Sequence, residues 1–229
     1  CALPISLGNG KPVVTANKEL LATEGRAVFD AAEAADRDLL FEAAVGGGIP
    51  LIRPLKGSLA GEAITRVLGI VNGTTNYILT RMTEDGSDLA AALAEAQRLG
   101  YAEPDPTADV EGIDASYKLA ILCGLAFHVA VAPEQVARQG ITRLGARDFR
   151  YADALGYTIK LLATGRLLDG GVVASVQPTL IAKDEPLAKV DGVLNAVQIE
   201  GDLVGRVLFQ GRGAGPNPTS SAEIGRAHV

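Results

Sequence analysis

An aspartate and a lysine stand four residues apart near the middle of the chain. In the stretch EPDPTADVEGIDASYK (103–118), Asp114 precedes Lys118, and the apolar run LAILCGLAFHVAVA follows directly. On a helix these two side chains share one face. The pair is either a solvated ion pair or a lysine held against apolar walls beside a carboxylate, where its proton affinity suits general acid catalysis. The apolar run after Lys118 favours the second interpretation.

The segment before this pair is acidic and stiff. Two prolines restrict its backbone and place the carboxylates of Glu103, Asp105 and Asp109 around the start of the predicted helix. We therefore expect several negative charges close to Lys118.

A second lysine occupies a position where α/β proteins bind ligands. The sequence TANK, Thr15–Lys18, follows a predicted strand and begins a predicted helix. Ligands bind at the carboxyl ends of parallel strands, so Lys18 there suits an anionic or oxygen-bearing ligand. The alternative is an ordinary helix start with a solvated lysine.

Two further motifs have both a functional and a structural interpretation. EAAVGGGIP, Glu42–Pro50, has glycines after a predicted strand, which either leave carbonyls free for a cation or form a hinge. NGTTN, Asn72–Asn76, either meets a substrate carboxylate or simply caps a helix. Cys123 is expected to pack in the core, and His128 to lie in the core or to compensate a helix dipole.

The elements that must position these residues have an α/β pattern. Residues 12–16 and 39–45 read as buried strands joined by a helix over 17–35, which is typical of a parallel βαβ unit. A strand at 64–71 followed by a helix is expected to repeat this pattern. Helices are predicted over 89–99, closed by Gly100, and over 110–129. Several strands are predicted after Pro133, the clearest at 172–178, so we expect a mixed sheet in the second half.

Composition excludes several classes of protein. Of the 229 residues, 48% are hydrophobic and 21% charged, which is typical of a globular chain. A net charge of −6 without a basic run argues against nucleic-acid binding. No apolar run is long enough to span a membrane, and two cysteines make neither a disulfide framework nor a zinc site. GRGAG, Gly211–Gly215, lacks the spacing of a dinucleotide-binding loop. We expect a soluble cytoplasmic protein.

The peptides at the two ends of the chain are related through the DNA that could encode them. EIGRAHV at one end and CALPI at the other can be encoded by complementary DNA strings that resemble a sequencing adapter. Cys1–Ser6 and Glu223–Val229 are therefore expected to be read-through artefacts around a genuine insert, roughly residues 7–222. Under this hypothesis Cys1 and His228 carry no functional meaning.

The residues from Ala96 to Lys118 resemble the signature of the homoserine dehydrogenase family, A-x3-G-Φ-[small]-x2-[D/N/S]-P-x2-D-Φ-x-G-x-D-x3-K with Φ aliphatic or aromatic, at every fixed position. Six other blocks are similar to that family in its order: KPVVTANKELLA, EAAVGGGIPLI, GIVNGTTNYIL, LGYTIKLLA, VDGVLNAVQIEGD and GRGAGPNPTSSA. The resemblance covers essentially all of residues 7–222 and is closest to the monofunctional bacterial form.

This resemblance implies an activity and a role for each matching residue. The family reduces L-aspartate 4-semialdehyde to L-homoserine with NAD(P)H, on the route to threonine, methionine and isoleucine. The resemblance makes Lys118 the proton donor and Asp114 a substrate-orienting residue. It places the other matching residues as follows: substrate-binding Glu103, Gly100, Asp109, Gly73 and Thr74; cofactor-binding Lys18, Thr15, Asn17 and Gly215; and a monovalent cation such as sodium at Glu42, Val45, Gly47 and Ile49.

The resemblance also implies a domain plan. Residues 7–50 would be the second half of a Rossmann-type nucleotide-binding domain, residues 51–205 a catalytic and dimerisation domain, and residues 206–222 a return to the first domain. The family's Gly-rich half would lie upstream, so the chain alone is expected to bind NADPH poorly and turn over little. A homodimer is expected. The alternatives are a reductase for a different small oxo acid and a non-catalytic amino-acid-binding or dimerisation module.

Overall fold

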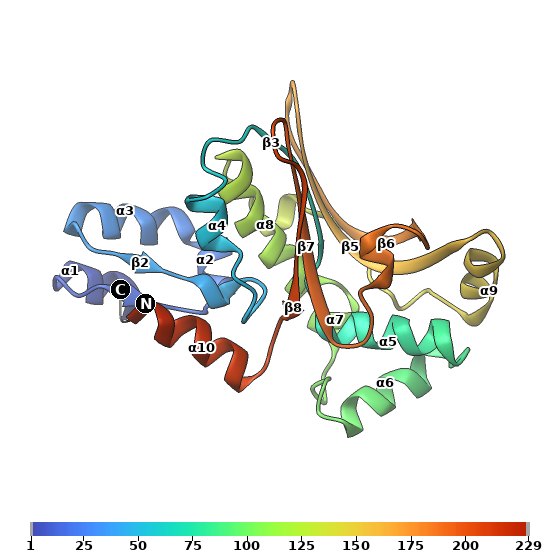
Figure 1. Ribbon diagram of the computed structural model, residues 1–229. Helices are drawn as coiled ribbons and strands as arrows, with labels where there is room; N and C mark the ends of the chain where they lie inside the picture. The colour runs from blue at the N-terminus through green and yellow to red at the C-terminus, as the bar shows by residue number, and fades with distance from the viewer. Residues whose placement is uncertain (1, 228–229) are drawn as a thin grey trace.

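The computed structural model describes residues 2–227, which form two sheets of different kinds. One sheet has two parallel strands, and the other has six strands in the order β4-β6-β5-β3-β7-β8. In Figure 1 the small sheet and its helices lie on one side of helix α8, and the large sheet, seen edge-on, lies on the other. The predicted α/β class with a parallel unit first and a mixed sheet later is confirmed.

The small parallel unit lies near the start of the chain. Strand β1 (Val13–Val14) pairs with β2 (Leu39–Leu40) in the register Val13 with Leu39. The helix expected over 17–35 is two helices, α2 (Lys18–Thr23) and α3 (Gly25–Ala35), because the backbone leaves helical geometry at Glu24. Each still buries an apolar side chain, Leu21 and Val28. Helix α1 (Ala2–Gly8) packs on α3.

The second strand of this unit is shorter than predicted. A strand over 39–45 was expected, but β2 ends at Leu40 and the 3-10 helix η1 (Glu42–Ala44) follows. The reason is a contact with the next helix, α4 (Ile52–Lys56). Oε1 of Glu42 accepts the N–H groups of Leu51 and Ile52 at 2.7 and 2.8 Å, and Oε2 accepts that of Arg53 at 3.0 Å. The chain turns early so that this buried carboxylate caps α4.

The six-stranded sheet is almost entirely antiparallel. Strand β3 (Ile64–Ile70) lies between β5 (Tyr157–Leu168) and β7 (Leu194–Gly201) and runs antiparallel to both. The expectation that β3 repeats the parallel βαβ pattern is therefore wrong, because its neighbours come from the last third of the chain. The remaining strands complete the sheet: β4 (Ala137–Arg138), β6 (Gly171–Ala182) and β8 (Gly205–Arg212). Only the β4–β6 pair is parallel among the described strands of this sheet.

The remaining helices connect or cover this sheet, apart from the last helix of the chain, which contacts η1 and β1 of the small parallel unit. They are α5 (Gly73–Glu84) with α6 (Leu89–Arg98); α7 (Thr107–Val110) with α8 (Ile113–Phe127); and α9 (Ala146–Ala154), α10 (Pro216–Ala227), η2 (Pro133–Gln135) and η3 (Pro186–Lys189). The helix predicted over 110–129 is interrupted between α7 and α8. Gly112 has a φ of +74°, a left-handed conformation that glycine tolerates without steric cost, so the chain changes direction there.

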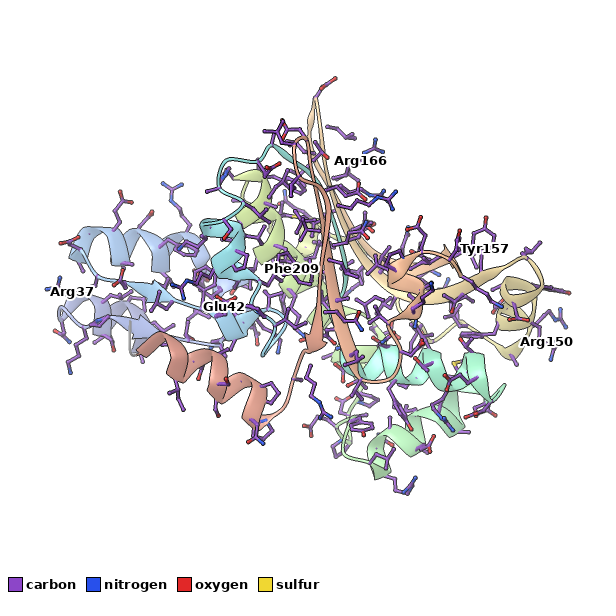
Figure 2. The ribbon with its side chains drawn as sticks, in the orientation of Figure 1. Arg37, Glu42, Arg150, Tyr157, Arg166 and Phe209 are labelled. Atoms are coloured by element: carbon purple, nitrogen blue, oxygen red, sulfur yellow. The ribbon has the colours of Figure 1, made fainter. Side chains whose placement is uncertain are left out.

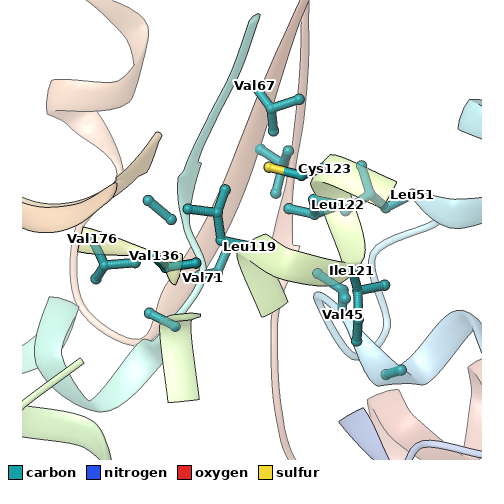
Figure 3. Packing of buried hydrophobic residues seen from close by; sticks show 14 of the residues in the cluster. Val45, Leu51, Val67, Val71, Leu119, Ile121, Leu122, Cys123, Val136 and Val176 are labelled. Atoms are coloured by element: carbon teal, nitrogen blue, oxygen red, sulfur yellow. The ribbon is translucent and has the colours of Figure 1, made fainter. Parts of the chain in front are cut away.

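Helix α8 forms the centre of the core. Figure 3 shows Leu119 and Cys123 directed toward the sheet, with Ile121 close to Val45 on the other side. Cys123 is fully buried, as expected, and a side chain on Gly165 of β5 would come within 2.7 Å of its Sγ. His128 ends α8 in a left-handed conformation and is exposed, so the expectation of a core position is wrong. Among residues 2–227 no helix is long and apolar enough to cross a membrane.

The structure describes the predicted return segment and most of both terminal peptides. Residues 206–212, expected to begin the return segment, belong to strand β8 because they pair along β7. In Figure 1 the two termini lie close together at the edge of the small sheet. Ala2–Ser6 are helical, and residues up to 227 continue α10. Cys1, His228 and Val229 lie outside the described residues, and the origin of the two terminal peptides stays a hypothesis.

Candidate active site

The predicted pair on α8 is buried. Lys118 and Asp114 are each 8% exposed, and Lys118 Nζ lies 2.6 Å from Oδ2 of Asp114. The same ammonium group donates to the carbonyl oxygen of Val71, at the end of β3, at 2.8 Å. Burial of both partners excludes the solvated ion pair that spacing alone left open.

Asn72 joins this pair to a second carboxylate. Its Oδ1 accepts the N–H of Thr75 at 2.8 Å and so caps α5, as expected from the NGTTN motif. Its Nδ2 donates to Oδ1 of Asp109 at 2.6 Å and to Oδ2 of Asp114 at 2.9 Å. The sequence gives no sign that this asparagine joins the site, because its only local signal is the capping pattern.

Lys18 reaches the same aspartate from the small parallel unit. Its Nζ lies 3.1 Å from Oδ1 of Asp114, so Asp114 lies between two ammonium groups. The Lys18 side chain is 40% exposed, whereas that of Lys118 is 11% exposed. Thr15 and Asn17 form local bonds that start α2: Thr15 Oγ1 accepts the N–H of Asn17, and Asn17 Oδ1 accepts that of Leu20. The turn formed by these two residues carries Lys18 to α8.

The pKa values of the two carboxylates that Asn72 bridges are shifted in opposite directions. Burial raises the pKa of Asp109, and the nearby charge of Asp114 raises it further. Burial also acts to raise the pKa of Asp114, but the ammonium groups of Lys118 and Lys18 outweigh it and hold that pKa below its usual value. Asp114 is therefore a permanent anion at neutral pH, and Asp109 is the more easily protonated of the two.

The residues expected around the substrate's amino-acid end lie at the ends of α5 and α6. Thr74 Oγ1 donates to the carbonyl of Tyr101 at 2.6 Å, and Gly100 turns the chain after α6 with a φ of +76°. Glu103 is exposed, and within residues 2–227 its carboxylate makes no hydrogen bond or ion pair with the Lys118 network. The structure thus brings Lys18, Asn72, Asp109, Asp114 and Lys118 together and leaves the Glu103 carboxylate free.

The glycine-rich turn after η1 lies against the segment that leads to α10. Gly46 and Gly47 have φ of +75° and +53°, and a side chain on Gly47 would come within 2.5 Å of the carbonyl oxygen of Gly213. Gly215, the expected cofactor contact, has a φ of +113°. The Glu42 carboxylate is committed to capping α4, where Figure 2 labels it, while the carbonyls of Val45, Gly47 and Ile49 belong to the turn itself.

A separate cavity of about 550 Å³ lies between α2, α3 and the end of α8, with Leu21, Phe29 and Leu125 in its walls. None of the residues of the Lys118 network lines it. The polar site and this cavity are therefore separate parts of the molecule.

The fold and the site define a class of protein: an α/β chain in which a buried lysine–aspartate pair on a core helix meets a second, more exposed lysine from a parallel βαβ unit. The model of the homoserine dehydrogenase family matches residues 50–225. The homoserine dehydrogenase of Mycobacterium tuberculosis is 55% identical over 225 residues, covering 96% of this chain and 51% of that protein. The chain belongs to the homoserine dehydrogenase family, a family of NAD(P)-dependent oxidoreductases.

Solved structures agree with this assignment. A homoserine dehydrogenase from Thiobacillus denitrificans has a TM-score of 0.96 and 47% identity, covering 98% of this chain and 52% of that one. A hyperthermophilic archaeal homoserine dehydrogenase mutant in complex with NADPH has a TM-score of 0.85 and 34% identity, covering 99% of this chain and 66% of that one. The chain spans about half the length of the curated relatives that it matches.

Proposed function

We propose that this chain carries the catalytic centre of a homoserine dehydrogenase that reduces L-aspartate 4-semialdehyde to L-homoserine in the biosynthesis of threonine, methionine and isoleucine. One observation carries the proposal: the ammonium group of Lys118 is buried and fixed by Asp114 and the Val71 carbonyl. This arrangement fits a proton donor to a developing alkoxide.

The two lysines have different tasks in the proposed reaction. When bound, a nicotinamide cofactor supplies a hydride to the carbonyl carbon. Lys118 Nζ gives a proton to the carbonyl oxygen, so that the aldehyde becomes an alcohol, and the neutral amine then regains a proton from solvent. Lys18, which is more exposed, stabilises the charge that develops on the oxygen. Asp114 stays ionised, because its pKa is lowered by both ammonium groups, and so it orients them without competing as the acid.

The substrate's amino-acid end would be bound by Glu103, which the reacting centre leaves free, and by Asp109, which Asn72 joins to that centre. The Glu103 carboxylate and Asp109 attract the substrate's ammonium group, with Gly100, Gly73 and Thr74 lining the same pocket. Glu103 is exposed and uncommitted, which supports this role. The neighbouring carboxylates would reject an oxo acid without an amino group, because their charges would then remain uncompensated.

The cofactor would lie between Lys18 and the Gly213–Gly215 segment, near Thr15 and Asn17. Gly215 has no side chain, so a flat ring can approach its backbone closely. The relative in complex with NADPH supports NADP, or NAD, as the cofactor class. We infer that residues 7–50 are the second half of a Rossmann-type domain and that residues 51–205 form the catalytic and dimerisation domain. Within the segment 206–222, the chain would return to the first domain once β8 ends at Arg212.

We assign the glycine turn to a monovalent cation such as sodium. Its donors would be the carbonyl oxygens of Val45, Gly47 and Ile49, which are the hard ligands that such ions prefer. Both oxygens of Glu42 accept N–H groups of α4, so Glu42 would contribute mainly negative charge and a fixed turn. A rise in melting temperature with sodium but not with choline would test this assignment.

The proposed homodimer would use the face of the large sheet opposite α8. A hollow of about 400 Å³ on the sheet has apolar residues beside charges of both signs, including Leu180, Arg66, Glu185 and Arg206. Charges of both signs beside apolar residues would let this face pair with the same face of a second copy across a two-fold axis. Leu180→Asp is expected to give a monomer in light scattering, whereas Leu203→Asp on the exposed β7–β8 turn leaves the dimer intact.

The activity is tested in an enzyme that contains this chain together with the rest of the length found in its relatives. NADPH oxidation with L-aspartate 4-semialdehyde is followed at 340 nm, and L-homoserine oxidation is measured in reverse. The proposal is supported if NADPH oxidation depends on the semialdehyde and does not occur with its analogue that lacks the amino group. Faster turnover of another oxo acid favours the rival reductase. Assembly defects in Lys118→Ala with turnover intact favour a non-catalytic module.

A further inference from the structure

A second buried lysine lies outside the proposed active site. Lys160 of β5 is 1% exposed, and its Nζ donates to the carbonyl oxygen of Val190 and to Oδ1 of Asp191, both at 2.7 Å. Both acceptors belong to the segment that joins η3 to β7. A buried ammonium group aimed at a loop fixes the position of that loop, because its donors have no water to turn to.

Two side chains of α5 hold the same segment from the other side. The Nδ2 of Asn76, which is itself 1% exposed, lies 2.9 Å from the carbonyl of Val190, 3.0 Å from that of Gly192 and 3.1 Å from that of Leu194. The hydroxyl oxygen of Thr80 accepts the N–H of Gly192 at 3.0 Å. We call Lys160, Asn76 and Thr80 the clamp, and residues 190–195 the clamped segment.

The clamped segment touches both halves of the proposed site. The carbonyl oxygen of Val193 lies 2.9 Å from the position that a side chain on Gly73 would take, directly after Asn72. The next contact is made by Asn195, which is 1% exposed: a side chain on Gly213 would collide with its Nδ2. Asn195 Oδ1 has no partner within the described chain and lies 3.5 Å from the same position on Gly73.

The contacts continue into the small parallel unit. The carbonyl of Gly213 lies against Gly47, and the N–H of Gly48 donates to the carbonyl of Arg212 at 3.3 Å. A continuous path of close contacts thus runs from Lys160, through Asn195, to the glycine turn. On one side of this path is the start of α5, whose Asn72 holds Asp109 and Asp114. On the other side is the glycine segment assigned to the cofactor.

We propose that Lys160, through the clamped segment and Asn195, is a positioning residue that sets the spacing between the substrate-binding start of α5 and the cofactor-binding glycines. This inference rests on the proposed function, because spacing matters most where hydride passes between two bound molecules. A misplacement of about 1 Å lowers such a rate by roughly 10²-fold even when both molecules still bind. Lys160 itself touches neither substrate nor cofactor.

The first test follows hydrogen exchange in the chain itself, comparing Lys160→Met with Lys183→Met. Lys183 forms an exposed ion pair with Asp153 and serves as the matched control. Three amides report on the path: Gly192 in the clamped segment, Thr75 at the start of α5 and Gly48 in the glycine turn. Lys160→Met is expected to accelerate exchange at all three by at least about tenfold, whereas the control changes none. Acceleration at Gly192 alone would overturn the proposal.

The second test measures kinetics in the enzyme that contains the full length found in relatives. Lys160→Met and Asn195→Ala are expected to lower kcat by about 10–100-fold while both KM values stay within about threefold. The isotope effect with NADPH deuterated at the transferred position should rise, because a misaligned hydride step limits turnover. Unchanged kcat in both variants, or a loss confined to KM, would refute positioning. If the unmutated enzyme does not reduce the semialdehyde, the proposed function is refuted. The hydrogen-exchange test would then still show whether Lys160 fixes the clamped segment, the start of α5 and the glycine turn.

Discussion

Two buried lysines in this chain have similar first contacts and different surroundings. Lys118 and Lys160 each donate to one backbone carbonyl and one aspartate at 2.6–2.8 Å. The aspartate beside Lys118 is buried and also contacts Asn72 and Lys18, whereas Asp191 beside Lys160 has a side chain that is 54% exposed. Asp114 therefore joins three elements at one point, while Asp191 only helps to fix a loop. What distinguishes a reacting centre from a structural anchor is the second ammonium group and its exposure to a ligand.

The largest expected difference between the two lysines is in turnover. Lys118→Met removes the proton donor and is expected to lower kcat by about 10³–10⁴-fold, at the upper end of the range for general acid catalysis. Lys160→Met is expected to lose no more than about 10²-fold. Stopped-flow measurement of NADPH oxidation at saturating semialdehyde compares the two. Equal losses would show that Lys118 acts only through position, as Lys160 does.

The second difference is in stability. Asp114→Asn leaves two ammonium groups without their shared anion, one of them buried, and is expected to reduce the free energy of unfolding at pH 7 by about 3–5 kcal/mol. Urea denaturation followed by circular dichroism measures this loss. Asp109→Asn is the matched control from the other side of Asn72, because the pKa of Asp109 is raised and its charge is not required by the fold. A loss as large in the control would show that Asn72, not the lysines, depends on these carboxylates.

The third difference appears on acidification. The pKa of Asp114 is lowered in the folded chain, so its contribution to stability is present above the unfolded value of about 3.9 and is lost as pH falls through the folded value. Asp109 changes stability with pH in the opposite direction, because its pKa is raised in the folded chain. Its contribution to stability is present below the unfolded value of about 3.9 and is lost as pH rises through the folded value.

Melting temperatures between pH 2.5 and 7 separate these two contributions. The melting temperature of the unmutated chain should fall below about pH 4, and this fall should be smaller in Asp114→Asn. If the melting temperature of Asp114→Asn falls as much at low pH as that of the unmutated chain, the acid sensitivity comes from other carboxylates.

The sequence alone predicted the parts of the site that depend on local pattern. Asp114 and Lys118 were placed by four-residue spacing on an apolar helix, and the Asn72 cap by the residues that follow it. The hydrogen bonds that turn these residues into one site span 37, 42 and 47 positions in the chain. No periodicity encodes such contacts, so the bridging role of Asn72 and the Val71 carbonyl required the fold.

The same reason explains the errors in the elements. Strand β2 ends early because Glu42 caps a helix that begins ten residues later, and hydrophobic pattern is insensitive to that contact. Gly112 interrupts the predicted long helix by adopting a left-handed conformation, which the glycine in the sequence permits but does not specify. The strand predicted over 172–178 lies within β6, because burial alternates there, but the structure extends β6 over Gly171–Ala182, where the alternation stops after Pro178.

The smallest expected difference concerns the exposed aspartate of the anchor. Asp191→Asn keeps an oxygen that can accept the Lys160 hydrogen bond, and water reaches this side chain, so the expected loss of stability is only about 1–2 kcal/mol. Added salt at about 1 M should shrink the difference, since it screens an exposed charge but hardly affects the buried Asp114 pair. Urea denaturation with and without salt measures both. A salt-independent loss as large as that of Asp114→Asn would mean that Lys160 needs a buried counter-charge, and that the two pairs differ only in the ligand that reaches them.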